Sequence, residues 1–142
     1  MSETTIREME QDEEFSAWFS DLLTEEDAAE GTSSRVEDRY LVLSSEIGDW
    51  VGGLRYTLQG GVAHLVEVAV APAERRQGHA HRLLGAFEER AAVHGAHLVE
   101  FWTDDHRSEA LLTAIGWRRM LARPGYIGGR TWYLMEKSVD PA

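Results

Sequence analysis

Arg75, Arg76 and Gly78 stand between an apolar run and a segment with helical periodicity, an arrangement suited to binding an anion. The valine-rich residues 62–70 predict a strand, and the apolar positions of residues 80–91 recur at helical spacing. A helix N-terminus offers backbone N–H groups without intrahelical partners and a positive dipole end. Gly78 lacks the Cβ that would keep a ligand from the backbone, and the two arginines suit a diphosphate. The stretch therefore predicts a strand, an anion-binding loop and a helix in succession.

Two side chains on the predicted strand, His64 and Glu67, have the chemistry of a general base. On a regular strand their opposite parity would direct them to opposite faces, although a bulge would change this. The alternative interpretation of each is a polar residue on a partly exposed strand face. Glu100 and Asp104, near the end of a later strand, are weaker base candidates. Asp104 or Asp105 can cap the helix that follows, and Asp104 is better suited to that role than to acting as a base.

The chain before this stretch predicts further elements that would position it. Residues 4–9 favour a short strand, and residues 11–23 favour a helix with one apolar face. Residues 24–34 are polar and predict a short helix or loop. Residues 39–44 and 50–58 predict two strands that form an antiparallel meander with residues 62–70. Gly52 and Gly53 indicate a bulge or a close backbone approach in that meander. The apolar face of the helix predicted for residues 11–23 comprises Phe15, Trp18, Phe19, Leu22 and Leu23.

The chain after this stretch continues the same sheet. Residues 97–103 predict a strand reached by a crossover, which makes it parallel to residues 62–70. A helix ending at Gly116 and two strands, residues 117–122 and 131–137, complete the chain. We therefore predict one domain over residues 1–142 with a fold of the α/β class (α+β). It should contain a mixed, mostly antiparallel sheet of about seven strands, together with about four helices.

Composition excludes several classes of function. The chain of 142 residues contains no cysteine, so disulfides, thiolate metal sites and a cysteine nucleophile are excluded. Its histidines have no metal-ligand spacing, and we expect no metal. The net charge of −11 disfavours a general nucleic-acid binder and suits a cationic acceptor, although the acids can simply solvate the surface. No apolar run could span a membrane, and we expect a cytoplasmic protein with no membrane partner.

The central stretch resembles the acetyl-CoA-binding signature of the GNAT N-acetyltransferase superfamily. The signature stands here as Val68-Ala69-Val70, then Pro72, then Arg75-x-x-Gly78-x-Ala80. The resemblance implies that acetyl-CoA is the co-substrate and that the central parallel strand pair splays apart to admit it. It also implies a set of residues that bind the cofactor: Val68, Ala69, Val70, Arg75, Arg76, Gln77, Gly78, His79, Ala80, His81 and Ser108.

A second stretch is similar to a family pattern but departs from it at one position. The stretch is Asp105-x-x-Ser108-x-x-Leu111-Leu112-x-x-x-Gly116-Trp117. Leu112 occupies the position where many members carry a tyrosine that protonates the leaving thiolate. Leucine cannot donate a proton, so the role of general acid does not carry over. Tyr126 and Tyr133 are candidates to replace it.

The resemblance implies a reaction in which the backbone N–H of Val70 polarises the thioester and an amine attacks it directly. Glu67 precedes the signature where many members carry a glutamate, and His64 occupies a position where protein-acetylating members carry one. Our leading hypothesis is an acetyl-CoA-dependent N-acetyltransferase acting on a primary amine of a small molecule or peptide, with Glu67 taking the ammonium proton directly or through a water. The alternatives are a non-catalytic acyl-CoA-binding module and a nucleotide-phosphate-binding regulator. The tryptophan-rich last strands also suggest a homodimer.

Overall fold

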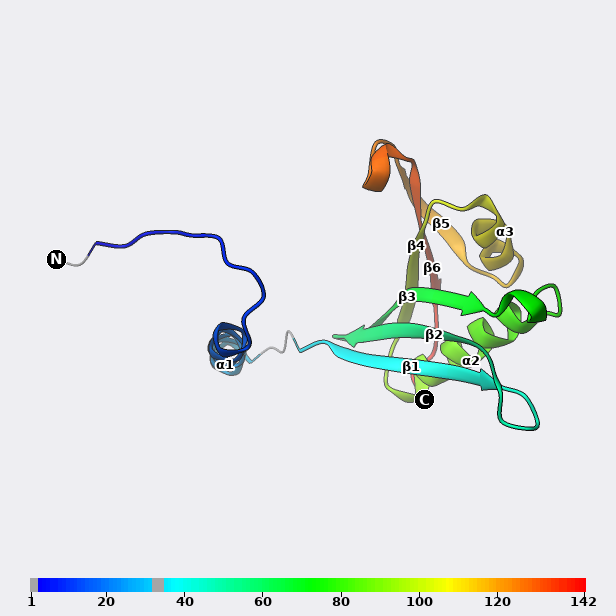
Figure 1. Ribbon diagram of the computed structural model, residues 1–142, viewed down its shortest axis with the longest axis horizontal. Helices are drawn as coiled ribbons and strands as arrows, with labels where there is room; N and C mark the ends of the chain where they lie inside the picture. The colour runs from blue at the N-terminus through cyan, green and yellow to red at the C-terminus, as the bar shows by residue number, and fades with distance from the viewer. Residues whose placement is uncertain (1–2, 32–34) are drawn as a thin grey trace. The chain divides into compact units, whose positions relative to one another are not determined.

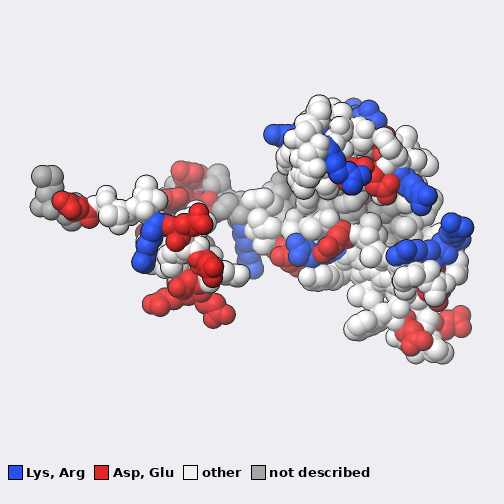
Figure 2. Space-filling view, turned by 45° about the horizontal axis from the view of Figure 1, so that its top comes forward, with Lys and Arg blue, Asp and Glu red and all other residues white. Residues whose placement is uncertain are grey.

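The computed structural model describes residues 3–31 and 35–142, and these fall into two compact units, Met1–Arg35 and Val36–Ala142. The first unit contains one helix, α1 (Glu13–Glu30). Asp12 caps its N-terminus by accepting a hydrogen bond from the Phe15 N–H (3.1 Å), and Gly31 ends it with a left-handed backbone (φ 72°). Phe15 stacks on Phe19 along the expected apolar face. Acidic side chains gather around this helix (Figure 2).

Two expectations for this unit need correction. The strand predicted for residues 4–9 was wrong, because residues 3–12 form neither strand nor helix. The helix predicted to stop at residue 23 continues to Glu30, since Ala28 and Ala29 favour helix and the first strong stop is Gly31. The rest of the predicted short helix or loop, residues 32–34, lies outside the described residues.

The second unit is built on a six-stranded sheet in the order β1-β2-β3-β4-β6-β5 (Figure 1). Its neighbouring strands are antiparallel except for the central pair, β3 and β4, which are parallel as the crossover predicts. The strands are β1 (Glu37–Ser44), β2 (Trp50–Gln59), β3 (Val62–Val70), β4 (Leu98–Thr103), β5 (Arg118–Arg123) and β6 (Trp132–Ser138).

Two helices of this unit pack on one face of the sheet, α2 (His79–Val93) and α3 (His106–Ala114). Short 3₁₀ turns follow β3 (η1, Pro72–Glu74) and β5 (η2, Ile127–Gly129). We call the side of the sheet that points away from α2 and α3 the open face. The described residues thus contain six strands and three α-helices, which confirms the mixed α+β fold but not the expected numbers of about seven and about four. None of the described helices is long and apolar enough to cross a membrane.

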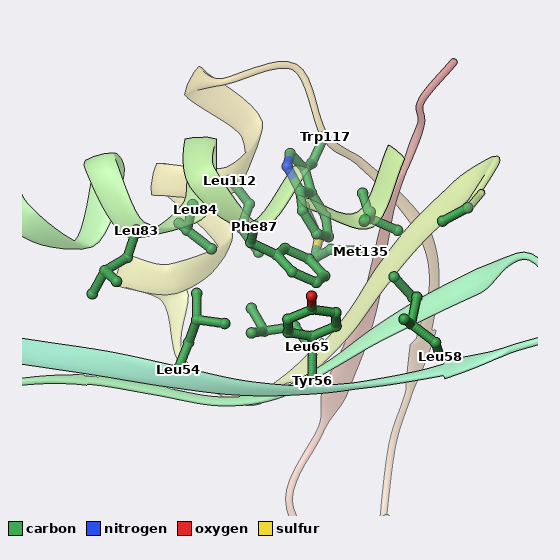
Figure 3. Close-up of a cluster of buried hydrophobic side chains, with 14 residues drawn as sticks. Leu54, Tyr56, Leu58, Leu65, Leu83, Leu84, Phe87, Leu112, Trp117 and Met135 are labelled. Carbon is green, nitrogen blue, oxygen red and sulfur yellow. The ribbon is translucent and has the colours of Figure 1, made fainter. Parts of the chain in front are cut away.

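The core lies between the sheet and the two helices (Figure 3). Tyr56 of β2 stands against Phe87 of α2 (ring centroids 5.1 Å apart), and Phe87 stacks on Trp117 (6.3 Å). Burial raises the pKa of the Tyr56 hydroxyl. Trp117 donates its indole N–H to Glu88 (3.2 Å), which also pairs with Lys137 (2.7 Å), so a polar link ties α2 to β6. This packing fixes α2 relative to β3, the strand that it follows.

Candidate functional site

The central strand pair opens into a gap at its C-terminal end. The ladder between β3 and β4 runs from Val62↔Leu98 to Leu65↔Phe101 and goes no further, although β3 continues to Val70. On the other side, the Ala71 N–H donates to Val51 O (2.8 Å). Because successive backbone groups of a strand point to opposite sides, the N–H groups of Val70 and Val68 point into the gap. The splayed pair implied by the family resemblance is therefore present.

A cavity of about 560 Å³, which we call the cleft, occupies this gap on the helix side of the sheet. It extends from the first turn of α2, along β3, to the last residues that pair β3 with β4, and α3 forms its far wall. Its volume lies in the range typical of ligand pockets. The cleft is lined by Leu65, Val68, Ala69, Val70, Glu74, Arg75, Arg76, Gly78, His79, Ala80, His81, Leu84, Phe101, Asp105, Arg107, Ser108, Leu111 and Leu112.

The loop before α2 has the backbone of an anion site. Gly78 is the N-cap residue and has φ 80°, and no side chain caps the first turn. Arg76, with φ 64°, also adopts the left-handed conformation. Alternation of this kind turns successive N–H groups toward one point, as in anion-binding nests. Arg75 donates from Nε to Val70 O (3.1 Å) and so ties the loop to the end of β3.

The opposite wall is formed by the start of α3. Asp105 caps this helix by accepting from the Arg107 N–H (3.0 Å), and it also accepts from the Ser108 hydroxyl (3.2 Å). Arg107 and Ser108 line the cleft. Ser108 was predicted from the second family stretch. Arg107 was not predicted, although its place between Asp105 and Ser108 in the first turn of a helix near the gap was a usable signal.

An ion pair fixes α3 to β5. Glu109 accepts two hydrogen bonds from Arg119, at 2.8 and 2.9 Å. These hydrogen bonds lower the pKa of the Glu109 carboxyl. Of the two residues expected as the cap of α3, Asp105 takes that position, and Asp104, which was also a candidate base, pairs with Arg130 (3.1 Å).

The candidate acids do not reach the cleft. Leu112 is 1% exposed and packs in the core, so its side chain provides an apolar wall. Tyr133 lies under the Arg119 guanidinium (4.3 Å), and Tyr126 packs between Trp102 and Trp132. Neither tyrosine lines the cavity. Gln77 is likewise missing from the lining, while the other ten residues expected to bind the cofactor belong to it.

A bulge in β3 places the two base candidates on one face. Opposite β2, the register shifts from Arg55↔Glu67 to Tyr56↔Leu65, which leaves Val66 as the extra residue. Tyr56 and Leu65 point into the core, so Glu67 and His64, which lies opposite Thr57, both point to the open face. The opposite directions expected for a regular strand therefore do not apply.

On the open face, His64 stands beside Glu100, its parallel partner in β4. The Nδ1 atom lies 3.4 Å from Glu100 Oε1, and the side chains are 35% and 29% exposed. Glu67 is exposed and lies opposite Arg55, which is 3.6 Å from Asp38. Neither His64 nor Glu67 lines the cleft.

The residues of the cleft fit an acyl-CoA. The loop at Gly78 presents backbone N–H groups and arginines for phosphates, and the gap beside Val68 and Val70 offers strand backbone to an amide-bearing arm. The apolar walls from Leu84 and Leu111 suit the arm's aliphatic parts. Among residues 3–31 and 35–142, no three histidine or acidic side chains are placed to hold a metal ion.

Comparisons with known proteins agree with this geometry. The sequence model of the Acetyltransferase (GNAT) family matches residues 4–117. Among solved structures, an acetyltransferase from Bacillus cereus ATCC 14579 superposes with a TM-score of 0.73, at 17% identity and with 94% of this chain and 98% of that chain covered. The ribosomal-protein-S18-alanine N-acetyltransferase from Escherichia coli superposes with a TM-score of 0.65, at 20% identity and with 83% of this chain and 78% of that chain covered.

Aminoglycoside 6'-N-acetyltransferase in complex with coenzyme A gives a TM-score of 0.63 at 16% identity, with 75% of each chain covered. No curated protein matches the sequence. The fold is thus that of these solved acetyltransferases. The chain belongs to the GNAT acetyltransferase family, and it is an N-acetyltransferase.

Proposed function

We propose that the protein uses acetyl-CoA and transfers the acetyl group directly to the primary amine of a small molecule or peptide. The observation that carries this proposal is the cleft, which joins an anion-binding helix terminus to the gap between β3 and β4. A thioester is already activated, so positioning it beside an amine supplies much of the rate. The protein then has to bind the donor, polarise its carbonyl and accept a proton.

The loop and helix α2 hold the diphosphate. The N–H groups of residues 78–81 precede the first intrahelical hydrogen bond, from Arg82 N–H to Gly78 O, and are available to a diphosphate, while Arg75 and Arg76 add positive charge. From there the pantetheine arm runs inward along β3. The Val70 N–H points into the gap and polarises the carbonyl oxygen, and the Val68 N–H is the next donor inward.

The open face supplies the proton acceptor. An alkyl ammonium has a pKa of about 10.4 on the lysine scale, so most of the amine carries a proton at neutral pH. Glu67 and His64 both stand on the open face of the strand that carries the carbonyl donors. A general acid is less important, because a thiol has a pKa of about 8.5 and its thiolate can leave unassisted. Replacing Tyr126 or Tyr133 by Phe should therefore leave turnover within about twofold of the unaltered protein.

The test is release of free CoA from acetyl-CoA over a panel of amines that includes polyamines, arylalkylamines, amino sugars and short peptides. The proposal expects amine-dependent release with at least one of these classes and a matching acetylated amine by mass spectrometry. Tight CoA binding without turnover on any amine would contradict it and would leave acyl-CoA binding as the activity. Competition by ATP at an affinity equal to that of CoA would instead favour a nucleotide-phosphate site.

A further inference from the structure

We propose that the acceptor is a primary monoamine with an apolar body, of the arylalkylamine class, and that this body binds in a groove beside Trp50 on the open face. The inference rests on the proposed function and names the substrate class of its acceptor. It comes from three observations: a bulge that turns Trp50 to the open face, a flat apolar floor beside it, and a groove that meets the cleft at Val70.

A second bulge, in β2, determines where Trp50 stands. Opposite β1, the register passes from Leu43↔Gly52 to Ser44↔Trp50, so Val51 is an extra residue. Leu43 packs against the core, and the next residue, Ser44, therefore lies on the open face together with its partner Trp50. The indole is 84% exposed there. Figure 1 shows this start of β2 beside the ends of β1 and β3.

The surface next to Trp50 is flat and apolar. Val42, Gly53 and Ala69 lie side by side across β1, β2 and β3. Neighbours of each along the chain pack against the core, so all three residues belong to the open face. Gly53 has no side chain and Ala69 has a single methyl group, so the indole and Val42 stand above a low floor. Ladders on both sides of β2 use its backbone polar groups, and the floor therefore offers a ligand mainly apolar contact.

A hollow of about 560 Å³, which we call the groove, lies along this floor and meets the cleft at the end of β3. The groove and the cleft share three lining residues: Ala69, Val70 and Arg75. The methyl group of Ala69 leaves room on the open face between the floor and the gap. An amine whose body lies in the groove can therefore extend past Ala69 to the gap, where the Val70 N–H polarises the thioester in the proposed function.

The lining of the groove disfavours polycations and sugars. None of its described residues is acidic, and its one charged residue is the cation Arg75, which donates to Val70 O. A polyamine carries several ammonium groups, and these would find no anionic partner in the groove. An amino sugar would bring hydroxyl groups onto a floor that gives them few hydrogen bonds. An aromatic ring, by contrast, can cover the floor and pack against the indole.

One acidic side chain suits the single ammonium group of a monoamine. Glu67 lies on the open face two residues before Ala69 and is exposed. Its partner across the ladder, Arg55, lies 3.6 Å from Asp38. Glu67 thus places a negative charge beside the floor and attracts the ammonium to the β3 side of the groove, while the ring points toward Trp50.

The experiment measures kcat/KM by release of free CoA for phenethylamine, ethylamine, spermidine and glucosamine. Phenethylamine should exceed ethylamine by about 10- to 100-fold, which is the effect of moving a phenyl group from water into an apolar site. Both are alkyl amines with one charge, so their ratio reports on the apolar body. Spermidine and glucosamine should be poorer substrates than phenethylamine. Faster turnover of spermidine or glucosamine would overturn the inference.

Trp50→Ala tests the place of the aromatic body. It should lower the ratio of kcat/KM for phenethylamine to that for ethylamine by about tenfold, mainly through KM, because the indole binds the body and not the reacting atoms. Trp50→Phe should keep most of the ratio. The matched control is Ile47→Ala, because Ile47 belongs to the same hairpin, is 86% exposed and does not line the groove.

Ile47→Ala should leave the ratio unchanged. Because both side chains are exposed, both alanine variants should unfold near the Tm of the unaltered protein, and titration with CoA should give the same affinity. A ratio that falls as far in Ile47→Ala as in Trp50→Ala would overturn the placement of the body beside Trp50.

Failure of this inference is distinct from failure of the proposed function. If the unaltered protein acetylates no amine, the proposed function is wrong and the inference falls with it. If it acetylates ethylamine as fast as phenethylamine, or if Trp50→Ala leaves the ratio unchanged, then the function stands and the groove is not the acceptor site.

Discussion

Gly78 is the position at which one substitution should separate ligand binding from folding. Its φ of 80° lies in the left-handed region, and a Cβ added there would meet no protein atom within 4 Å. The Cβ of a replacement residue therefore meets no other part of the protein. Replacement by Val places a β-branched residue in a strained backbone conformation and fills space at the mouth of the cleft.

The expected magnitudes differ for folding and for binding. The left-handed conformation costs a residue with a Cβ about 1–2 kcal/mol, which lowers Tm by roughly 3–8 °C for a chain of this size. If the loop relaxes instead, its N–H groups turn away from the diphosphate. Losing one charge-assisted hydrogen bond costs about 1.5–3 kcal/mol, which weakens CoA binding by roughly 10- to 100-fold.

The assay is isothermal titration calorimetry with CoA, paired with thermal unfolding. The matched control is Gly85→Val, because Gly85 lies in the same helix, is exposed and also has no protein atom near an added Cβ. Its φ is not positive, and Gly and Val differ by only a few tenths of a kcal/mol in helix propensity. Gly85→Val should bind CoA normally. A folded Gly78→Val protein with unchanged affinity would refute the placement of the diphosphate.

Three further predictions concern the frame around the cleft. Leu112→Ala should lower the free energy of unfolding measured in urea by about 2–5 kcal/mol, because Leu112 is 1% exposed and truncating its side chain leaves a cavity. A loss under about 1 kcal/mol would contradict this, because it would mean that neighbouring side chains move in and fill the cavity. For Arg119→Met, loss of the hydrogen bonds to Glu109 should lower Tm. Those hydrogen bonds lower the pKa of Glu109 in the folded protein. The difference in Tm between the two proteins should therefore reach its full size above the unfolded-state pKa of about 4.3 and shrink as the pH falls through the pKa of the folded state. A difference in Tm that does not change with pH would contradict this. The edge strand β5, which exposes Met120 and Leu121, should join a second copy in a homodimer, and a monomer mass at all concentrations in sedimentation equilibrium would exclude it.

The local patterns in the sequence predicted most of the second unit. The valine-rich residues 62–70 form β3 with the same bounds, and the helix behind Gly78 buries Leu83, Leu84 and Phe87 as its periodicity indicates. Gly52 was expected at a close backbone approach, and a Cβ there would lie 2.8 Å from Ala69 O. These features depend on neighbours in the chain, so the sequence carries a direct signal for them.

Other features depend on partners far away in the chain. The strand expected at residues 4–9 has suitable side chains, but no ladder pairs with those residues in the structure. The bulge at Val66 arises from the register between β2 and β3, and a valine at that position does not indicate a bulge. As a result, the sequence could name His64 and Glu67 but not place them on one face, and it could not pair His64 with Glu100.

The most direct test of the central claim is a crystal structure of the protein with bound CoA. We predict density for the diphosphate at the backbone N–H groups of residues 78–81 and for the pantetheine arm between β3 and β4, with the sulfur beside the Val68 and Val70 N–H groups. CoA bound elsewhere, with the gap between the two strands empty, would contradict the account.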